Sequence, residues 1–325
     1  MITVEHLTKR YGSFTAVDDL SFEIEAGHVY GFLGPNGAGK STTMNIMTGC
    51  LSATAGHVQI DGYDVFEHPK EAKRWIGYLP EQPPLYLNET PEEYLHFVGE
   101  AKGIKGTALR EQIDSVVEQT GLGPVRRQRI ATLSKGYRQR VGIAQALLGN
   151  PSVVILDEPT VGLDPIQIIE IRDLIKTLGK SHTVILSSHI LSEVRAVCDQ
   201  IMIISKGKLV ASDTPDHLEK LFAGSMSLEL TLRGSQDDIR RVLGQIPGVG
   251  SLSFHSGEVD GAQGVTLETT PPADLSEAVF AACARENLPI LRMGMQKASL
   301  EDVFLELTGG ADSTTQENAE GRPVA

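Results

Sequence analysis

The sequence predicts an α/β chain of two domains, the first a mixed sheet around a phosphate-binding loop and the second a small α+β unit. Three observations support this prediction. The glycine-rich segment Gly34–Ser41 follows an apolar strand and leads into a helix. The apolar run "SVVILDE" (152–158) is typical of a parallel strand covered on both faces. Beyond residue 224, strands and helices alternate in a different order, and 325 residues are enough for two domains.

The first 90 residues are read as strands and one short helix. "AVDDLSFEIEAG" (16–27) and "HVYGFL" (28–33) alternate apolar and polar residues, which predicts strands of a partly solvated sheet. "GPNGAGKSTTMNIMTG" (34–49) runs from a loop into a helix ended by Gly49, and "GHVQIDGYDV" (56–65) is another strand and turn.

A helical insert follows, at about residues 90–150. Apolar residues recur at helical spacing in "PEEYLHFVGEAKGI", "TALREQIDSVVEQTGL" and "YRQRVGIAQALLGN", and Pro91 suits the start of a helix. The segment "YLPEQPPLY" (78–86) lies before the insert. It is read as a loop, because its three prolines exclude a helix or a central strand.

After Pro151 the β–α alternation returns. "SVVILDE" and "HTVILSSH" (182–189) are read as buried strands, each followed by a helix. "QIMIISKGKLVASD" (200–213) predicts a hairpin that turns at Lys206-Gly207. The first domain is assigned to residues 1–222.

The second domain is assigned to residues 223–308. Its pattern of strand, helix, strand, strand, helix, strand fits a split-βαβ, ferredoxin-like unit, followed by a last helix, "SLEDVFLEL". Two roles are left open: a regulatory or dimer-stabilising module, or an accessory fold that only supports the first domain. The small, polar tail 309–325 is expected to be disordered.

Composition narrows the class of protein. A net charge of -13 argues against non-specific nucleic-acid binding, which depends on basic contacts to phosphates. Three distant cysteines are read as free thiols in a reducing compartment. Neither a signal peptide nor an apolar run long enough to span a bilayer is evident, so any membrane role needs a partner.

Three segments carry residues suited to phosphate chemistry. In Gly34–Ser41 the backbone N–H groups can face a phosphate, Lys40 can reach it, and the Ser41 hydroxyl can ligate Mg²⁺. Asp157 ends a strand where it can hold Mg²⁺, and Glu158 can deprotonate a water molecule. "LSKGYRQR" (133–140) offers a second helix start, although a simple capped helix is the alternative.

Five ordered motifs now point to a family. The segment 34–41, "LSKGYRQR", "VVILDEP" (153–159), "GLDP" (162–165) and "SSH" (187–189) together resemble the nucleotide-binding subunit of ABC transporters over about residues 2–220. "YLPEQPPLY", the degenerate signature and "SLEDVFLELTG" look like the ABC-2-type exporter branch. The implied fold is a P-loop NTPase of ABC type, with a mixed-sheet core, an antiparallel β subdomain and a helical subdomain. Lys135 and Tyr137 depart from the usual L-S-G-G-Q signature, whereas Ser134 and Gly136 keep it.

The resemblance implies a role for each matching residue. It places adenine on Tyr11, the Mg²⁺ carboxylate at Asp157, the catalytic base at Glu158 and the γ-phosphate switch at His189. Ser134 and Gly136 would contact ATP held by the opposite subunit, and Asp164 would couple the two sites. The phosphate loop would consist of Gly34, Asn36, Gly37, Gly39, Lys40, Ser41 and Thr42.

The glutamine loop of the family aligns with the proline loop, but the aligned residue is Glu81 rather than Gln82. We therefore expect Glu81 to approach Mg²⁺ and to report the nucleotide state, with Gln82 as the alternative.

The implied function is ATP binding and hydrolysis by a dimer that sandwiches two MgATP and drives a separate integral-membrane ABC-2 permease. The dimer is a homodimer or a pair with a second ABC ATPase, and it lies peripherally on the cytoplasmic face of the inner membrane. No nucleic acid is expected. One alternative is a soluble ABC-type ATPase of translation or DNA repair, and another is a regulatory ATP-binding module that does not hydrolyse ATP.

Overall fold

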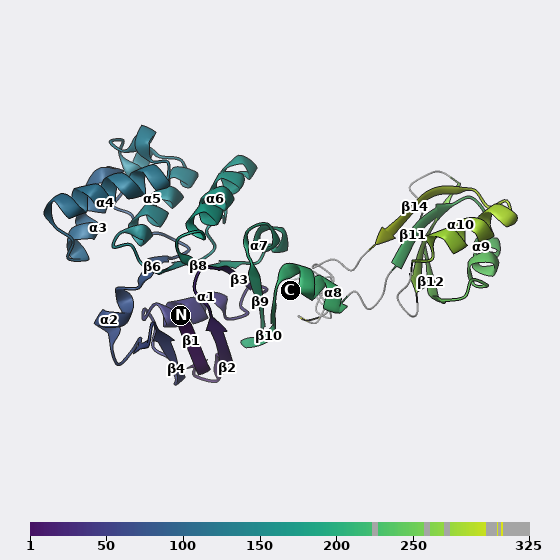
Figure 1. Ribbon diagram of the computed structural model, residues 1–325, viewed down its shortest axis with the longest axis horizontal. Coiled ribbons are helices and arrows are strands. Elements are labelled where there is room, and N and C mark those ends of the chain that lie inside the picture. Colours follow the sequence, from purple (N-terminus) through teal and green to yellow (C-terminus); the bar gives the residue numbers. More distant parts are fainter. Residues whose placement is uncertain (223–226, 257–260, 270–273, 297–303, 305–306, 308–325) are drawn as a thin grey trace, which may run out of the picture. The chain divides into compact units, whose positions relative to one another are not determined.

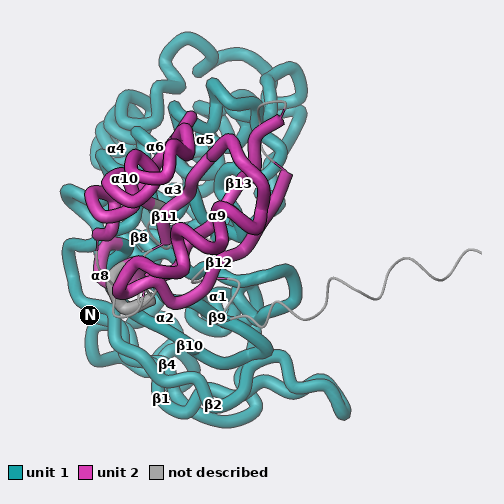
Figure 2. The backbone as a smooth tube through the Cα atoms, turned by 90° about the vertical axis from the view of Figure 1, so that its right-hand side faces the viewer, with its two compact units in different colours: residues 1–215, 307–309 teal, residues 216–306, 310–325 magenta. Residues whose placement is uncertain are grey.

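The computed structural model describes residues 1–222, 227–256, 261–269, 274–296, 304 and 307. It divides into two compact units, the first Met1–Pro215 and the second within residues 216–306 (Figure 2). Helix α8 (Pro215–Phe222) begins at the division. Most of the last predicted helix and all of the predicted tail lie outside the described residues. None of the helices in the described ranges is both long and apolar enough to cross a bilayer.

The first unit is organised around a six-stranded mixed sheet in which only β10 is antiparallel to its neighbour. All residues of β3, β7 and β8 are buried, as expected for strands covered on both faces. The expectation that "HVYGFL" belongs to a partly solvated sheet is wrong, because β3 lies inside this sheet between β8 and β9. In spatial order the strands are β10 (Lys208–Asp213), β9 (Gln200–Ser205), β3 (Val29–Leu33), β8 (Thr183–Ser188), β7 (Val153–Leu156) and β6 (Ile76–Leu79).

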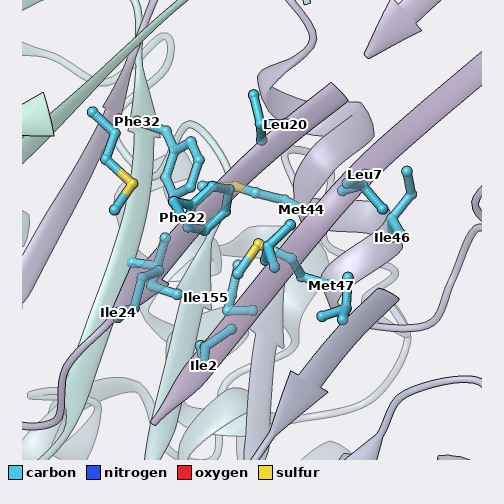
Figure 3. Close-up of a cluster of buried hydrophobic side chains, with 14 of the residues drawn as sticks. Ile2, Leu7, Leu20, Phe22, Ile24, Phe32, Met44, Ile46, Met47 and Ile155 are labelled. Carbon is cyan, nitrogen blue, oxygen red and sulfur yellow. The ribbon is translucent and has the colours of Figure 1, made fainter. Parts of the chain in front are cut away.

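A second, antiparallel sheet packs beside it, in the order β2-β1-β4-β5. Figure 3 shows the apolar cluster to which both sheets and helix α1 (Lys40–Met47) contribute, including Phe22 and Phe32 with ring centroids 5.4 Å apart. This core supports the start of α1, where the phosphate loop ends. The strands are β1 (Ile2–Tyr11), β2 (Phe14–Ile24), β4 (Ala55–Ile60) and β5 (Tyr63–Asp64).

The predicted helical insert is present and forms one end of the first unit (Figure 1). Thr90 caps α3 with a reciprocal hydrogen-bonded pair involving Glu93, which explains why the helix starts at Pro91. The insert contains α3 (Pro91–Ala101), α4 (Gly106–Gln119), α5 (Lys135–Leu147) and the short 3-10 turns η1 (Gly123–Val125) and η2 (Ile130–Thr132), and α2 (Pro69–Lys73) precedes it.

Two helices follow the buried strands of the main sheet: α6 (Pro165–Leu178) after β7 and α7 (Leu191–Val197) after β8. The predicted hairpin is confirmed, because β9 and β10 pair antiparallel and both Lys206 and Gly207 have positive φ.

The second unit has one four-stranded antiparallel sheet in the order β12-β13-β11-β14, as a ferredoxin-like unit requires. Its apolar cluster draws on one face of the sheet and on both helices. The elements are β11 (Ser227–Leu232), α9 (Gln236–Leu243), β12 (Val249–Ser256), β13 (Gln263–Thr269), α10 (Ser276–Arg285) and β14 (Ile290–Gln296).

Candidate active site

The loop between β3 and α1 exposes backbone donors at the start of a helix. Gly37 and Gly39 have φ values of +80° and +106°, which only glycine adopts readily. Gly39 precedes α1 without a side-chain cap, and the first turn carries no acidic residue. The free N–H groups and the positive end of the helix dipole therefore favour an anion at this point.

Neighbouring backbone braces this loop. A Cβ atom on Gly34 would lie 2.3 Å from the carbonyl oxygen of Ile204, so only glycine fits there without movement of the backbone. The N–H of Gly207 donates to the Ala38 carbonyl (2.9 Å), and the N–H of Asp18 donates to the Gly207 carbonyl (2.9 Å). The β9–β10 hairpin thus ties the loop to β2, a contact that the sequence analysis did not foresee.

Lys40 is almost fully buried at the start of α1. Its ammonium group donates to the carbonyl oxygen of Gly34 (2.7 Å) and lies 3.8 Å from Oε1 of Glu158. Burial lowers the pKa of Lys40, while the negative charges of Glu158 and Asp157 oppose that shift. A bound phosphate would add negative charge and further stabilise the ammonium form.

Asp157 receives two hydroxyl hydrogen bonds at one carboxylate oxygen. The Ser41 hydroxyl donates to Oδ1 over 3.0 Å, and the Ser187 hydroxyl donates to the same atom over 2.6 Å. The hard oxygens of Ser41 and Asp157 are the ligand type that Mg²⁺ prefers, so this pair fits the cation. Among the described residues no group of three or more His, Cys, Asp or Glu side chains could hold a metal ion.

Glu158 is held in a left-handed backbone conformation, with φ of +47°. Its N–H donates to the Ser187 hydroxyl (2.8 Å), and its Oε2 lies 3.0 Å from Nδ1 of His189. The Ser187 hydroxyl therefore holds the carboxylate of Asp157 and the backbone of Glu158. Ser187 belongs to the motif "SSH", but no role was predicted for it, although its place at the end of β8 was the available signal.

The phosphate loop, Glu158 and His189 line one cavity of about 430 Å³. Glu81 is among its lining residues and Gln82 is not. At the rim Tyr11 is 49% exposed, and Phe14 joins it as an aromatic wall that the sequence analysis did not propose. Gly34 accepts a hydrogen bond from Lys40, and Asp157 accepts one from Ser41. The other lining residues include Asn36, Gly37, Gly39, Lys40, Ser41, Thr42 and Val161.

Ser134, Gly136 and Asp164 line a different cavity of about 270 Å³. The Ser134 side chain accepts from the N–H of Tyr137 (3.3 Å) and caps α5, while Asp164 accepts from the N–H of Gln167 (2.9 Å) and caps α6. The candidate residues thus fall into two groups on one chain, and the signature residues do not line the phosphate-loop cavity.

The chain is similar to known proteins over 95% of its length. A family model described as "ABC transporter" matches residues 17–161. The chain is 36% identical over 312 residues to "Bacitracin transport ATP-binding protein BcrA" of Bacillus licheniformis, an alignment that covers 95% of this chain and 98% of that protein. It is 31% identical to "Linearmycin resistance ATP-binding protein LnrL" of Bacillus subtilis (strain 168), again covering 95% of this chain and 98% of the relative.

A solved structure supports the same assignment. It is described as a dimeric, post-hydrolysis state of the ATP-binding cassette MJ0796 bound to ADP and Pi, and it matches with a TM-score of 0.59 and 26% identity. The match covers 66% of this chain and 98% of that one.

The chain belongs to the ABC transporter family. It is an ATP-binding subunit with ATPase activity, and the function expected from the motifs is confirmed at this level. No comparison supports the alternative of a soluble ATPase in translation or DNA repair.

Proposed function

We propose that two copies of this chain, or this chain and a second ABC ATPase, enclose two MgATP molecules between them. Each ATP would be bound by the phosphate loop of one subunit and by Ser134 and Gly136 of the other. The observation that carries this proposal is the separation of the two residue groups into two cavities on one chain. A single chain then offers two half-sites, and a dimer would join them.

The side chains around the larger cavity suit hydrolysis. Glu158 would accept a proton from the attacking water, and His189, 3.0 Å from it, would orient that carboxylate and contact the γ-phosphate. Lys40 would exchange its carbonyl partners for phosphate oxygens. Ser41 and Asp157 would hold Mg²⁺, with Glu81 nearby, and the cation would neutralise charge on the phosphates.

The partner would be an integral-membrane permease of the ABC-2 type, with this chain on the cytoplasmic face. Close to Glu81 in the sequence, the proline loop and α3 present an apolar surface of Tyr86, Leu87 and Phe97, which are 51%, 48% and 50% exposed. The rings of Tyr86 and Phe97 lie 5.2 Å apart. Such a patch next to a nucleotide-sensing loop suits docking of a permease segment.

The relatives suggest the class of cargo. One is named for bacitracin transport and another for linearmycin resistance. We therefore propose export of compounds of the kind that these names give, bacitracin and linearmycin, with selectivity located in the permease.

Glu158→Gln tests the proposed base. The variant keeps the shape of the side chain but cannot take up a proton, so ATP should bind and stay uncleaved. We expect an ATPase rate reduced by about 100-fold or more. We also expect an ATP-dependent dimer in size-exclusion chromatography with light scattering, while the parent stays monomeric once its ATP is consumed. Hydrolysis at the parent rate would refute the assignment of Glu158.

A further inference from the structure

Glu193 is a buried carboxylate, only 5% exposed, that the proposed chemistry does not use. It lies in the first turn of α7, and its Oε2 accepts two hydroxyl hydrogen bonds, from Thr160 (2.5 Å) and from Ser188 (3.0 Å). Its Oε1 lies 3.8 Å from Nη2 of Arg172 in α6. Burial of a carboxylate is unfavourable unless hydrogen bonds or an opposite charge compensate for the lost solvation. Thr160, Ser188 and Arg172 provide this compensation for Glu193.

The contact with Ser188 reaches the turn that carries His189. The Ser188 hydroxyl donates to Glu193 and also accepts from the N–H of Ile190 (3.0 Å). The backbone on both sides of His189 is therefore held by one hydroxyl group. Because Glu193 sets the direction of that hydroxyl, it also sets the position of the His189 turn.

The contact with Thr160 reaches the segment that leads from Glu158 to Asp164. Thr160 is 6% exposed and takes part in two successive turns. In the first turn the N–H of Val161 donates to the Glu158 carbonyl (3.2 Å). In the second turn the N–H of Leu163 donates to the Thr160 carbonyl (3.2 Å). The segment thus runs from a lining residue of the larger cavity to a lining residue of the smaller one.

A single carboxylate oxygen consequently joins two chain segments, one carrying His189 and the other joining Glu158 to Asp164. Arg172 approaches the second oxygen of Glu193 from α6, the helix that Asp164 caps. A shift of Asp164 on one side would move the shared oxygen and, through Ser188, the histidine turn.

We propose that Glu193 is a positioning residue that couples the Glu158–Asp164 segment to the His189 turn, so that hydrolysis at the larger cavity depends on the state of the smaller one. This rests on the proposed roles of Glu158 and His189. Glu193 touches neither nucleotide nor water in this account, and it acts through Ser188 and Thr160.

The test uses the full chain with Glu193→Ala and with the matched control Ser192→Ala, an exposed neighbour in the same helix turn. We expect Glu193→Ala to lower kcat by about 10–100-fold while KM and ATP affinity stay near the parent values, since misplacement of catalytic groups affects the chemical step. The control should keep the parent kcat. Parent-like kcat in Glu193→Ala would overturn the proposal.

Two milder variants keep the test decisive if Glu193→Ala folds poorly. Thr160→Val and Ser188→Ala each remove one hydroxyl group. If Glu193 couples the two segments, the loss in kcat of the double variant will differ from the product of the two single losses. When Glu193→Gln is also present, this non-additivity between Thr160→Val and Ser188→Ala should become smaller or disappear. Independent effects in the parent background would show that Glu193 is only a satisfied buried carboxylate.

His189→Ala and Glu158→Gln are measured in parallel. If both lose hydrolysis while the Glu193 variants do not, only the coupling proposal fails. If those two variants hydrolyse ATP normally, the proposed function itself fails.

Discussion

Glu158 holds a strained backbone conformation at the point where the buried strand β7 ends. A left-handed φ of +47° costs a non-glycine residue about 1–3 kcal/mol, and such strain concentrates at functional sites. The hydrogen bond that its N–H donates to the buried Ser187 hydroxyl offsets part of this cost. The folded state thus presents the carboxylate to His189 before any nucleotide binds.

The choice between Glu81 and Gln82 can be tested at the same scale. Only Glu81 lines the cavity of the phosphate loop. We expect Glu81→Ala to lower the ratio of transport to ATP hydrolysis by about tenfold in membranes that contain the permease, because the loop loses its contact with the site. Gln82→Ala is the matched control and should leave the ratio unchanged. The reverse pattern would make Gln82 the sensor.

At the scale of elements, the phosphate loop depends on neighbours that are remote in sequence. The motif Gly34–Ser41, the strand before it and the helix after it could be predicted because glycine spacing and apolar runs are local signals. The brace from Gly207, the two hydrogen bonds of Ser187 and the aromatic wall at Phe14 could not be predicted, because they depend on which strands become neighbours. The same reason explains the wrong sheet for β3: "HVYGFL" alternates like a solvated strand, yet it pairs with β8 and β9.

Gly34→Ala tests the packing of this element. The added Cβ atom would meet the backbone oxygen of Ile204 at 2.3 Å, and backbone cannot rotate away. We expect the free energy of unfolding to fall by about 1–3 kcal/mol in urea titrations. Gly123→Ala, where nothing lies within 4 Å of the added atom, is the control. Equal shifts in both variants would mean that the loop yields to the extra atom.

At the scale of the whole molecule, one chain carries two separate cavities lined by candidate site residues, and a second compact unit. The relatives BcrA and LnrL align over 95% of the chain, whereas the dimeric cassette covers 66% of it. The alignments with these transport and resistance proteins therefore extend into the C-terminal unit.

The most direct test of the account is to mix two inactive variants. Lys40→Ala removes the phosphate-loop ammonium, and Gly136→Asp places a carboxylate where we propose that the partner's γ-phosphate binds. In the proposed dimer, each variant alone would have two defective sites. A mixed dimer regains one intact site, composed of the phosphate loop of one subunit and the signature of the other. We predict that the mixture hydrolyses ATP faster than either variant alone. A mixture no faster than its components would contradict the claim that the two cavities are halves of a shared site.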